Sequence, residues 1–220
     1  MQDWIRHLFE NRDLTRMGHG QRVDDLNLGL GWIYYGLARA MRPKTAVVIG
    51  SFRGFVPLVI AKGIADNAEG GELIFIDPSF VDDFWKDPAA VEAHFADHGL
   101  DNVRHFLMTT QAFAESEACR HLAEVGLVFI DGHHTVDQAQ FDFETFEPRL
   151  AADGIALFHD TRHYRMSRMH GPERSYRHDV KDYVDSLKDR PDLQVFDLPF
   201  ADGVSLVRKA DGPGVGLQVD

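Results

Sequence analysis

The chain has 220 residues, 44% of them hydrophobic and 26% charged, which is enough for one large hydrophobic core. Acidic residues outnumber basic ones by 35 to 23 and give a formal charge of -12, so nucleic acid is not expected as a partner. No apolar stretch reaches the roughly 18–20 residues of a membrane span, and no signal-type apolar block lies near the start. The single Cys119 can form neither an internal disulfide nor a zinc cluster. We therefore expect a soluble, cytoplasmic protein.

The first 43 residues predict a helical cap. Apolar residues at helical spacing predict a helix that ends at Pro43, namely Leu26, Leu30, Ile33, Leu37 and Met41. The same segment carries the aromatic residues Trp32, Tyr34 and Tyr35. These can pack on the sheet of their own chain or become buried in a homo-oligomer, and both alternatives stay open.

Five short apolar runs follow at intervals of about 25–30 residues, the length of a strand-plus-helix unit. They occupy residues 45–50, 72–77, 103–108, 126–131 and 154–160. Runs that are apolar almost throughout predict parallel strands covered on both faces. The segments between them have helical patterns, clearest over 135–150, where Thr135 and Gln138 resemble a capping box.

The last two apolar runs, 193–198 and 203–209, are separated by four residues. A parallel crossover needs about a dozen residues, so these runs predict an antiparallel hairpin. The sequence therefore predicts an α/β fold over residues 44–210, with a doubly wound, mostly parallel seven-stranded sheet, a terminal antiparallel hairpin, and helices on both faces. Residues 211–220 contain three glycines and a proline and predict a flexible tail.

Two glycines and an aspartate follow the first two predicted strands. Gly50 and Gly54 flank a turn that leads into a helix, where the backbone can approach a ligand closely. Their spacing differs from the GxGxxG of a dinucleotide site, and an ordinary strand-to-helix turn is the alternative interpretation. Asp77 ends the second strand, where it can accept the hydroxyls of a ribose or cap a helix. Together these features favour a ligand that contains a nucleoside.

Two further aspartates, Asp131 and Asp160, end neighbouring predicted strands. Carboxylates that converge in a cleft repel each other unless a cation or a proton lies between them, so we expect a divalent metal here. His159 faces the opposite side by strand alternation, unless a twist at the strand end turns it inward. His134 can reach the cleft and take a proton from a hydroxyl, or merely cap the next helix.

These motifs together resemble the class I S-adenosylmethionine-dependent methyltransferases. The segment IDGHHTVDQAQFDFETFEPRLAADGIALFHDT is similar to the signature of a small-molecule group that includes macrocin O-methyltransferase and cephalosporin-biosynthesis proteins. The resemblance extends over residues 20–210. It implies a Rossmann-like sheet with the strand order 3-2-1-4-5-7-6.

The resemblance also implies roles for individual residues. Gly50, Ser51 and Gly54 would surround the methionine part of the cofactor. The remaining implied contacts are Asp77 to the ribose, Thr110 and Gln111 to the adenine, Asp131 to the cofactor, and Asp131, His159 and Asp160 to a divalent metal such as Mg²⁺ or Mn²⁺. His134 would be the general base that removes the proton of the acceptor hydroxyl.

The chain departs from this family pattern at two places. Many relatives have an acidic residue two positions before the first glycine, where this chain has Val48. The amino group of the cofactor therefore needs another partner. Arg53 lies in the same loop and is unfavourable near a sulfonium unless it points to solvent or to an anionic substrate.

Residues 162–178 contain five arginines and one acidic residue, Glu173. They follow the fifth strand, so they predict a basic segment over the site that binds an anionic acceptor. A solvated loop and a subunit contact are the alternatives. The histidines of this segment are given no role: His163, His170 and His178.

The function predicted from these features is an O-methyltransferase that uses S-adenosylmethionine, assisted by a metal, and acts on a hydroxyl of a small polar molecule such as a sugar or a natural-product intermediate. Two alternatives remain. The chain can be a cofactor-binding module without catalysis, or a metal-dependent lyase or hydrolase on the same fold.

Overall fold

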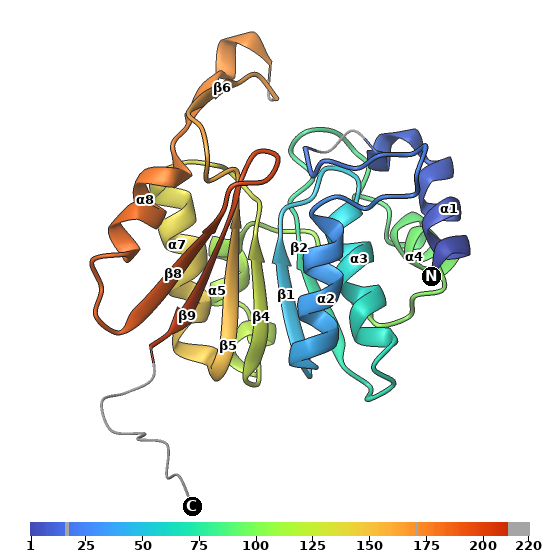
Figure 1. Ribbon diagram of the computed structural model, residues 1–220, viewed down its shortest axis with the longest axis horizontal. Coiled ribbons are helices and arrows are strands. Elements are labelled where there is room, and N and C mark those ends of the chain that lie inside the picture. The colour runs from blue at the N-terminus through green and yellow to red at the C-terminus, as the bar shows by residue number, and fades with distance from the viewer. Residues whose placement is uncertain (16–17, 170, 211–220) are drawn as a thin grey trace, which may run out of the picture.

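The computed structural model describes residues 1–15, 18–169 and 171–210, and its centre is a seven-stranded sheet in the order β3-β2-β1-β4-β5-β9-β8 (Figure 1). The strands are β1 (Thr45–Ile49), β2 (Glu72–Ile76), β3 (Val103–Phe106), β4 (Val125–Ile130), β5 (Leu150–His159), β8 (Leu193–Leu198) and β9 (Val204–Lys209). The first five pair in parallel, and β9 is antiparallel to both β5 and β8. This confirms the predicted sheet, including its order and its terminal hairpin.

Helices cover both faces of the sheet, as predicted (Figure 1). One face carries α1 (Gln2–Glu10), α2 (Gly31–Met41), α3 (Phe55–Ala65) and α4 (Pro88–Asp97), and the other carries α5 (Thr110–Glu115), α6 (Glu117–Arg120), α7 (Val136–Phe146) and α8 (Val180–Leu187). Alternation along each strand divides the core accordingly, so that Val48 packs under the first set and Val47 under the second. Short 3-10 turns occupy Arg12–Thr15, Glu147–Arg149 and Pro172–Arg174.

The predicted start of the N-terminal helix is wrong. Leu26 has a positive φ of 53° and lies in a turn closed by the pairing of Arg22 with Asn27, so α2 begins only at Gly31. α1 was not predicted. Ile5 and Leu8 of α1 lie in the same core as the sheet. The predicted tail, 211–220, lies outside the described residues.

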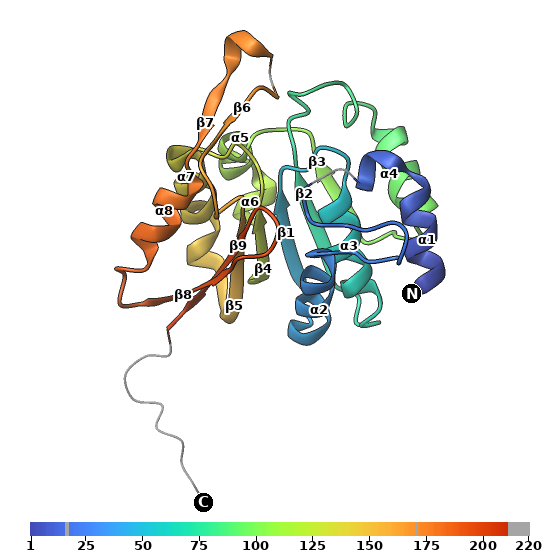
Figure 2. The same cartoon turned by 45° about the horizontal axis from the view of Figure 1, so that its top comes forward.

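Strands β6 (Arg165–Ser167) and β7 (Tyr176–His178) form a separate two-stranded antiparallel sheet, here called the arginine hairpin. It rises from the carboxyl edge of the main sheet, between β5 and α8 in sequence (Figures 1 and 2). The sequence predicted a basic segment at this place but not its strands. From here on, the name arginine hairpin covers these two strands and the residues next to and between them, 162–169 and 171–178.

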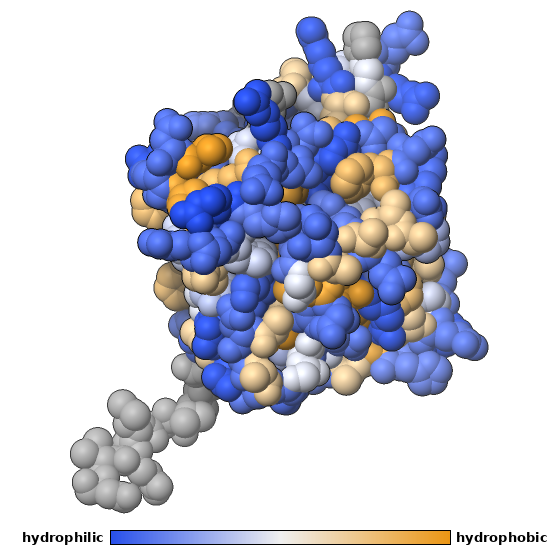
Figure 3. Space-filling view, turned by 90° about the vertical axis from the view of Figure 1, so that its right-hand side faces the viewer, coloured by the Kyte–Doolittle hydropathy of each residue, from blue (hydrophilic) through white to orange (hydrophobic). Residues whose placement is uncertain are grey.

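No helix within the described ranges is long and apolar enough to cross a lipid bilayer. On the side of the molecule that carries α1 and α4, hydrophilic side chains dominate and apolar ones are scattered among them (Figure 3). The oligomeric state that the sequence left open stays a prediction.

Candidate functional site

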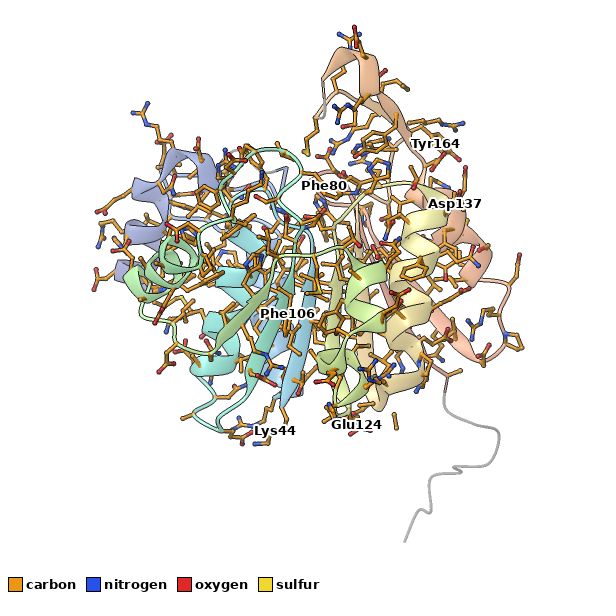
Figure 4. All side chains as sticks on the ribbon, turned by 180° about the vertical axis from the view of Figure 1, so that it is seen from behind. Lys44, Phe80, Phe106, Glu124, Asp137 and Tyr164 are labelled. Atoms are coloured by element: carbon orange, nitrogen blue, oxygen red, sulfur yellow. The ribbon has the colours of Figure 1, made fainter. Side chains whose placement is uncertain are left out.

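A cavity of about 760 Å³ lies at the carboxyl edge of the sheet, within the usual size range of small-molecule sites. It is bordered by the loops that follow β1, β2, β3, β4 and β5 and by the arginine hairpin. Phe80 and Tyr164 lie at this end of the molecule, whereas Lys44 and Glu124 lie at the opposite end (Figure 4). The cavity is therefore at the edge where ligands of doubly wound sheets bind.

Gly50 and Gly54 shape the loop after β1. Gly50 has a φ of +76°, and a Cβ there would lie 2.4 Å from the backbone oxygen of Asp131. Gly54 has a φ of +89°, and a Cβ there would lie 2.9 Å from the ring of Trp85. Both positions therefore require glycine, for conformation and for space. The Oγ of Ser51 accepts a hydrogen bond from the Gly54 N–H at 3.1 Å, which holds the turn that begins α3.

Asp77 lies against this loop, as its predicted role requires. Its Oδ2 accepts a hydrogen bond from the N–H of Ser51 at 2.9 Å, and its Oδ1 accepts one from the N–H of Ser79 at 2.7 Å. Burial raises the pKa of Asp77, against the effect of these two hydrogen bonds. Both oxygens keep lone pairs that can accept ligand hydroxyls, because each carboxylate oxygen takes about two bonds.

Neither of the two residues that depart from the family pattern, Arg53 and Val48, faces the cavity. Arg53 does not face the cavity: its guanidinium pairs with Asp82 at 2.7 Å and lies over the rings of Phe52 and Phe84. Val48 is fully buried in the core and cannot contact a ligand. Two acids of the cavity lining lie beside this loop: the backbone of Asp131 lies against Gly50, and the carboxylate of Asp77 accepts a hydrogen bond from Ser51.

Thr110 and Gln111 start α5 and also line the cavity. Two residues of α7 line the same end, and neither was predicted to do so. The side chain of Gln138 bonds both Gln111 and the buried carboxylate of Asp142, at 2.9 and 2.7 Å. Burial raises the pKa of Asp142 to about 6, while hydrogen bonds from Thr110 and Gln138 act in the opposite direction.

Asp131 and His159 form a close pair. The Nδ1 of His159 lies 2.9 Å from Oδ1 of Asp131 and 3.5 Å from Oδ1 of Asp160. Burial lowers the pKa of His159, but the two carboxylates outweigh burial and the net shift is upward. The ring of His19, from the segment before α2, lies 4.4 Å from that of His159. Burial lowers the pKa of His19 to about 3, so it is neutral beside the charged pair.

Asp160 is a buried carboxylate of the site and has an unusual backbone conformation. Its φ of 61° interrupts the strand alternation after β5, which lets it share a cleft with the preceding His159. Its Oδ2 accepts a hydrogen bond from Arg165 at 2.5 Å and lies 3.2 Å from Nδ1 of His178. Burial raises the pKa of Asp160, but His178, His159, His134 and Arg165 lower it, and the net shift is strongly downward.

His134 lies close to both carboxylates. Its Nε2 is 3.5 Å from Oδ2 of Asp160 and 3.8 Å from Oδ1 of Asp131. Burial lowers the pKa of His134 to about 4, in spite of both carboxylates. The imidazole is therefore neutral at pH 7 and has the protonation state that a general base needs.

The arginine hairpin is tied to the site by several contacts. The ring of Tyr176 stacks on His133 with centroids 3.8 Å apart, and the ring of His178 stacks on His134 at 4.3 Å. Arg165 and Arg174 both line the cavity. The segment that was predicted to lie over the site therefore contributes side chains to the cavity lining.

Some site residues were missed by the sequence analysis. His178 and Arg165 contact Asp160 only because β6 and β7 pair, and the basic composition of the segment was the only signal for them. Within the described residues, two groups of three side chains have donor atoms within 4.8 Å of one another: His7, Asp97 and His98 outside the cavity lining, and His134, Asp160 and His178 in the site. The group in the site shares only Asp160 with the predicted metal ligands, which are Asp131, His159 and Asp160.

A family model described as a methyltransferase domain matches residues 47–161. No curated protein sequence matches the chain. Solved structures of similar fold include the O-methyltransferase TomG from Streptomyces achromogenes in complex with SAM, with 15% identity, coverage of 95% of this chain and 88% of that chain, and a TM-score of 0.63. An O-methyltransferase from Bacillus cereus in complex with SAH has 13% identity, coverage of 94% and 90%, and a TM-score of 0.64.

A methyltransferase from Podospora anserina, solved with bound SAH, has 20% identity, coverage of 96% of this chain and 86% of that chain, and a TM-score of 0.60. At identities this low, the TM-scores of 0.60–0.64 show a common fold and nothing more. The finer likeness to the macrocin and cephalosporin group stays a prediction. The family model itself covers more than half of the 220 residues, from β1 to the turn after β5. The chain therefore belongs to this family of methyltransferase domains.

Proposed function

We propose that the chain transfers the methyl group of S-adenosylmethionine to a hydroxyl of a small polar molecule. The observation that carries this proposal is that one and the same cavity, of about 760 Å³, is lined by the Gly50–Ser51 loop, by Asp77 and by His134. Neighbours of the same fold that were solved with SAM or SAH support the choice of cofactor.

The cofactor would extend along the loops after β1, β2 and β3. Gly50, Ser51 and Gly54 would enclose its methionine part, and Asp77 would accept its ribose hydroxyls. Thr110 and Gln111 would lie by the adenine. Since Val48 offers no charge, we propose the carboxylate of Asp131, beside Gly50, as the partner of the amino group.

In the transfer step, the acceptor oxygen attacks the sulfonium methyl group, an oxygen–carbon bond forms, and the carbon–sulfur bond breaks. His134 takes the proton of the hydroxyl at Nε2 and later releases it to solvent. The carboxylates at 3.5 and 3.8 Å stabilise the imidazolium as it forms. The products are S-adenosylhomocysteine and the methyl ether, so the protein mainly aligns the oxygen and removes its proton.

A divalent metal was predicted because two carboxylates need a cation between them. Here side chains of the chain occupy that space: the Arg165 guanidinium lies against Asp160, and the Nδ1 of His159 lies against Asp131. A metal bound by Asp131, His159 and Asp160 would have to break the hydrogen bond between His159 and Asp131 and displace Arg165 from Asp160, so this arrangement does not fit a metal and we route no step through one. Metal assistance stays a prediction, tested by calorimetric titration with Mg²⁺ and Mn²⁺.

For the acceptor we propose a molecule with an anionic group. Arg165 and Arg174 line the cavity on the side of His134 and its stacking partner, and guanidinium groups bind carboxylates and phosphates through paired hydrogen bonds. On the opposite rim, Phe80 is 70% exposed and offers an apolar surface to the rest of the molecule. A subunit contact remains the second candidate role for the hairpin.

The test is calorimetric titration with S-adenosylmethionine and with S-adenosylhomocysteine, followed by a screen of anionic hydroxy compounds for S-adenosylhomocysteine release. Micromolar binding and release with at least one compound are expected. Absence of binding to both cofactors would refute the proposal. Binding without release across the screen would favour the non-catalytic module.

A further inference from the structure

We infer that Asp142 and Gln138 determine the base specificity of the cofactor site, because they fix the side-chain amide of Gln111 so that its oxygen is presented to a purine 6-amino group. The inference rests on the proposed function, since it names two positioning residues of the cofactor-binding end of the cavity. All three side chains line that end.

The three side chains form a directed chain of hydrogen bonds. Nε2 of Gln138 donates to Oδ1 of Asp142 at 2.7 Å, and Nε2 of Gln111 donates to Oε1 of Gln138 at 2.9 Å. Asp142 is 1% exposed, Gln138 is half-buried and Gln111 is exposed. This series of hydrogen bonds therefore runs from the core to the cavity.

The carboxylate sets the direction of this chain. An ionised carboxylate only accepts hydrogen bonds, so the amide nitrogen of Gln138 must face Asp142 and its oxygen must face Gln111. Gln111 must then turn its nitrogen toward Gln138. The oxygen of Gln111 is left as an acceptor, and turning its amide by 180° would place two oxygens against each other.

Asp142 is suited to anchor the chain because it is both buried and charged at neutral pH. Burial raises its pKa to about 6, and the hydrogen bonds from Thr110 and Gln138 keep the pKa from rising further. At pH 7.5 the carboxylate form dominates, so the acceptor-only argument holds at that pH.

An outward acceptor distinguishes two purines of the same shape. Adenine carries a 6-amino donor, which the Gln111 oxygen can accept, whereas hypoxanthine carries a 6-oxo acceptor, which it repels. An untethered glutamine could reverse its amide and suit either base. Hypoxanthine at this place would set its 6-oxo acceptor against the fixed Gln111 oxygen, and a site that hydrogen-bonds one group discriminates against the analogue that lacks it.

α7 contains a matched control for this pair. Gln140 donates to Glu144 at 2.7 Å with the same four-residue spacing, but both residues lie outside the cavity lining. Gln140 is exposed. Replacing Gln140 therefore removes the same kind of helix-surface hydrogen bond without affecting Gln111.

The experiment measures the affinities of S-adenosylhomocysteine and S-inosylhomocysteine at pH 7.5 by calorimetry, for the unchanged protein, Gln138→Met and Gln140→Met. The unchanged protein is expected to prefer the adenosyl compound by about 10- to 100-fold. Gln138→Met should reduce this preference to about threefold or less, because Gln111 is free to reverse. Gln140→Met should keep the full preference.

Asp142→Asn is the second variant, since a neutral amide can present either its nitrogen or its oxygen to Gln138, and the preference should fall here too. An unchanged preference in both Gln138→Met and Asp142→Asn, with S-adenosylhomocysteine still bound, would overturn the inference and leave the proposed function standing. If the unchanged protein binds neither compound, the proposed function and the inference fall together.

Discussion

The cofactor half and the acceptor half of the cavity are built by different means. In the cofactor half, backbone groups hold the carboxylate proposed for the ribose: Asp77 accepts hydrogen bonds from the N–H groups of Ser51 and Ser79. In the acceptor half, side chains hold side chains, and Asp160 is fixed by Arg165 and His178 from the arginine hairpin. The first half depends on the main sheet and the helices α5 and α7 packed on it, whereas the second half also requires the hairpin to be formed.

This difference implies that the halves can be disabled separately. Variants in the acceptor half should lower turnover and leave the affinity for S-adenosylhomocysteine intact. Variants in the cofactor half should weaken that affinity. The predictions below test the separation, from the largest expected effect to the smallest.

Replacing His134 should have the largest effect on catalysis. His134→Ala is expected to lower kcat about 10²- to 10⁴-fold, the usual loss for a missing general base. The affinity for S-adenosylhomocysteine should stay within about twofold, because no predicted cofactor contact is removed. His163→Ala, an exposed histidine of the hairpin outside the cavity lining, is the control. Full activity of His134→Ala would place the base elsewhere.

The pH dependence sharpens the same point. Burial lowers the pKa of His134 to about 4, so the folded protein keeps this base neutral above about pH 5. The base is lost only as the pH falls through 4. The pH profile of kcat/KM should therefore lack an acid limb between pH 5 and 8 from this group. A limb near pH 6.5 that disappears in His134→Ala would contradict the assigned protonation state.

The next largest effect is on the frame shared by both halves. Gly50→Ala would place a Cβ 2.4 Å from the backbone oxygen of Asp131 at a φ of +76°. We expect the free energy of unfolding to fall by at least about 2 kcal/mol, measured by urea denaturation. Gly36→Ala is the control: it lies inside α2 with nothing within 4 Å of the added Cβ, and should stabilise by about 0.5–1 kcal/mol. Equal stabilities would show that the loop can shift.

The parts predictable from sequence follow the same division. The sheet order and the positions of Gly50 and Asp77 could be predicted because apolar runs and turn residues specify where parallel strands end, and function gathers at that edge. The start of α2 could not, because Leu26 continues the helical spacing although a turn holds its backbone at a positive φ. Local periodicity carries no information about such a turn.

The contacts of Asp160 show a second limit. Its place at a strand end was predictable, but its partners were not, because Arg165 and His178 are brought together by a register that pairs them across β6 and β7. The metal was inferred from two carboxylates without knowledge of these cations. Asp142 is similar: helical spacing places it on α7, but its burial at the cavity depends on the packing of α5 against α7.

Asp77→Asn tests the cofactor half alone. The amide replaces one acceptor by a donor, which must then oppose the N–H of Ser51 or Ser79 and can no longer accept two ribose hydroxyls. The affinity for S-adenosylhomocysteine should fall about 10- to 100-fold by calorimetry. Asp83→Asn, which alters an exposed carboxylate paired with Lys86, should leave it unchanged. An unchanged affinity in Asp77→Asn would remove this residue from the site.

Arg174→Gln should have the smallest effect and tests the acceptor half alone. Arg174 lines the cavity, yet it is exposed, so its attraction for an anionic acceptor is screened by water and salt. The KM for such an acceptor should rise about 3- to 10-fold while kcat changes less than twofold, and this difference should shrink as salt is added. Arg168→Gln, on the same hairpin but outside the cavity lining, is the charge-matched control. If only Arg174→Gln raises the KM, its guanidinium contacts the acceptor. If both variants raise the KM equally, the hairpin acts through its total charge. A lower affinity for S-adenosylhomocysteine in Arg174→Gln would show that the two halves are not separable.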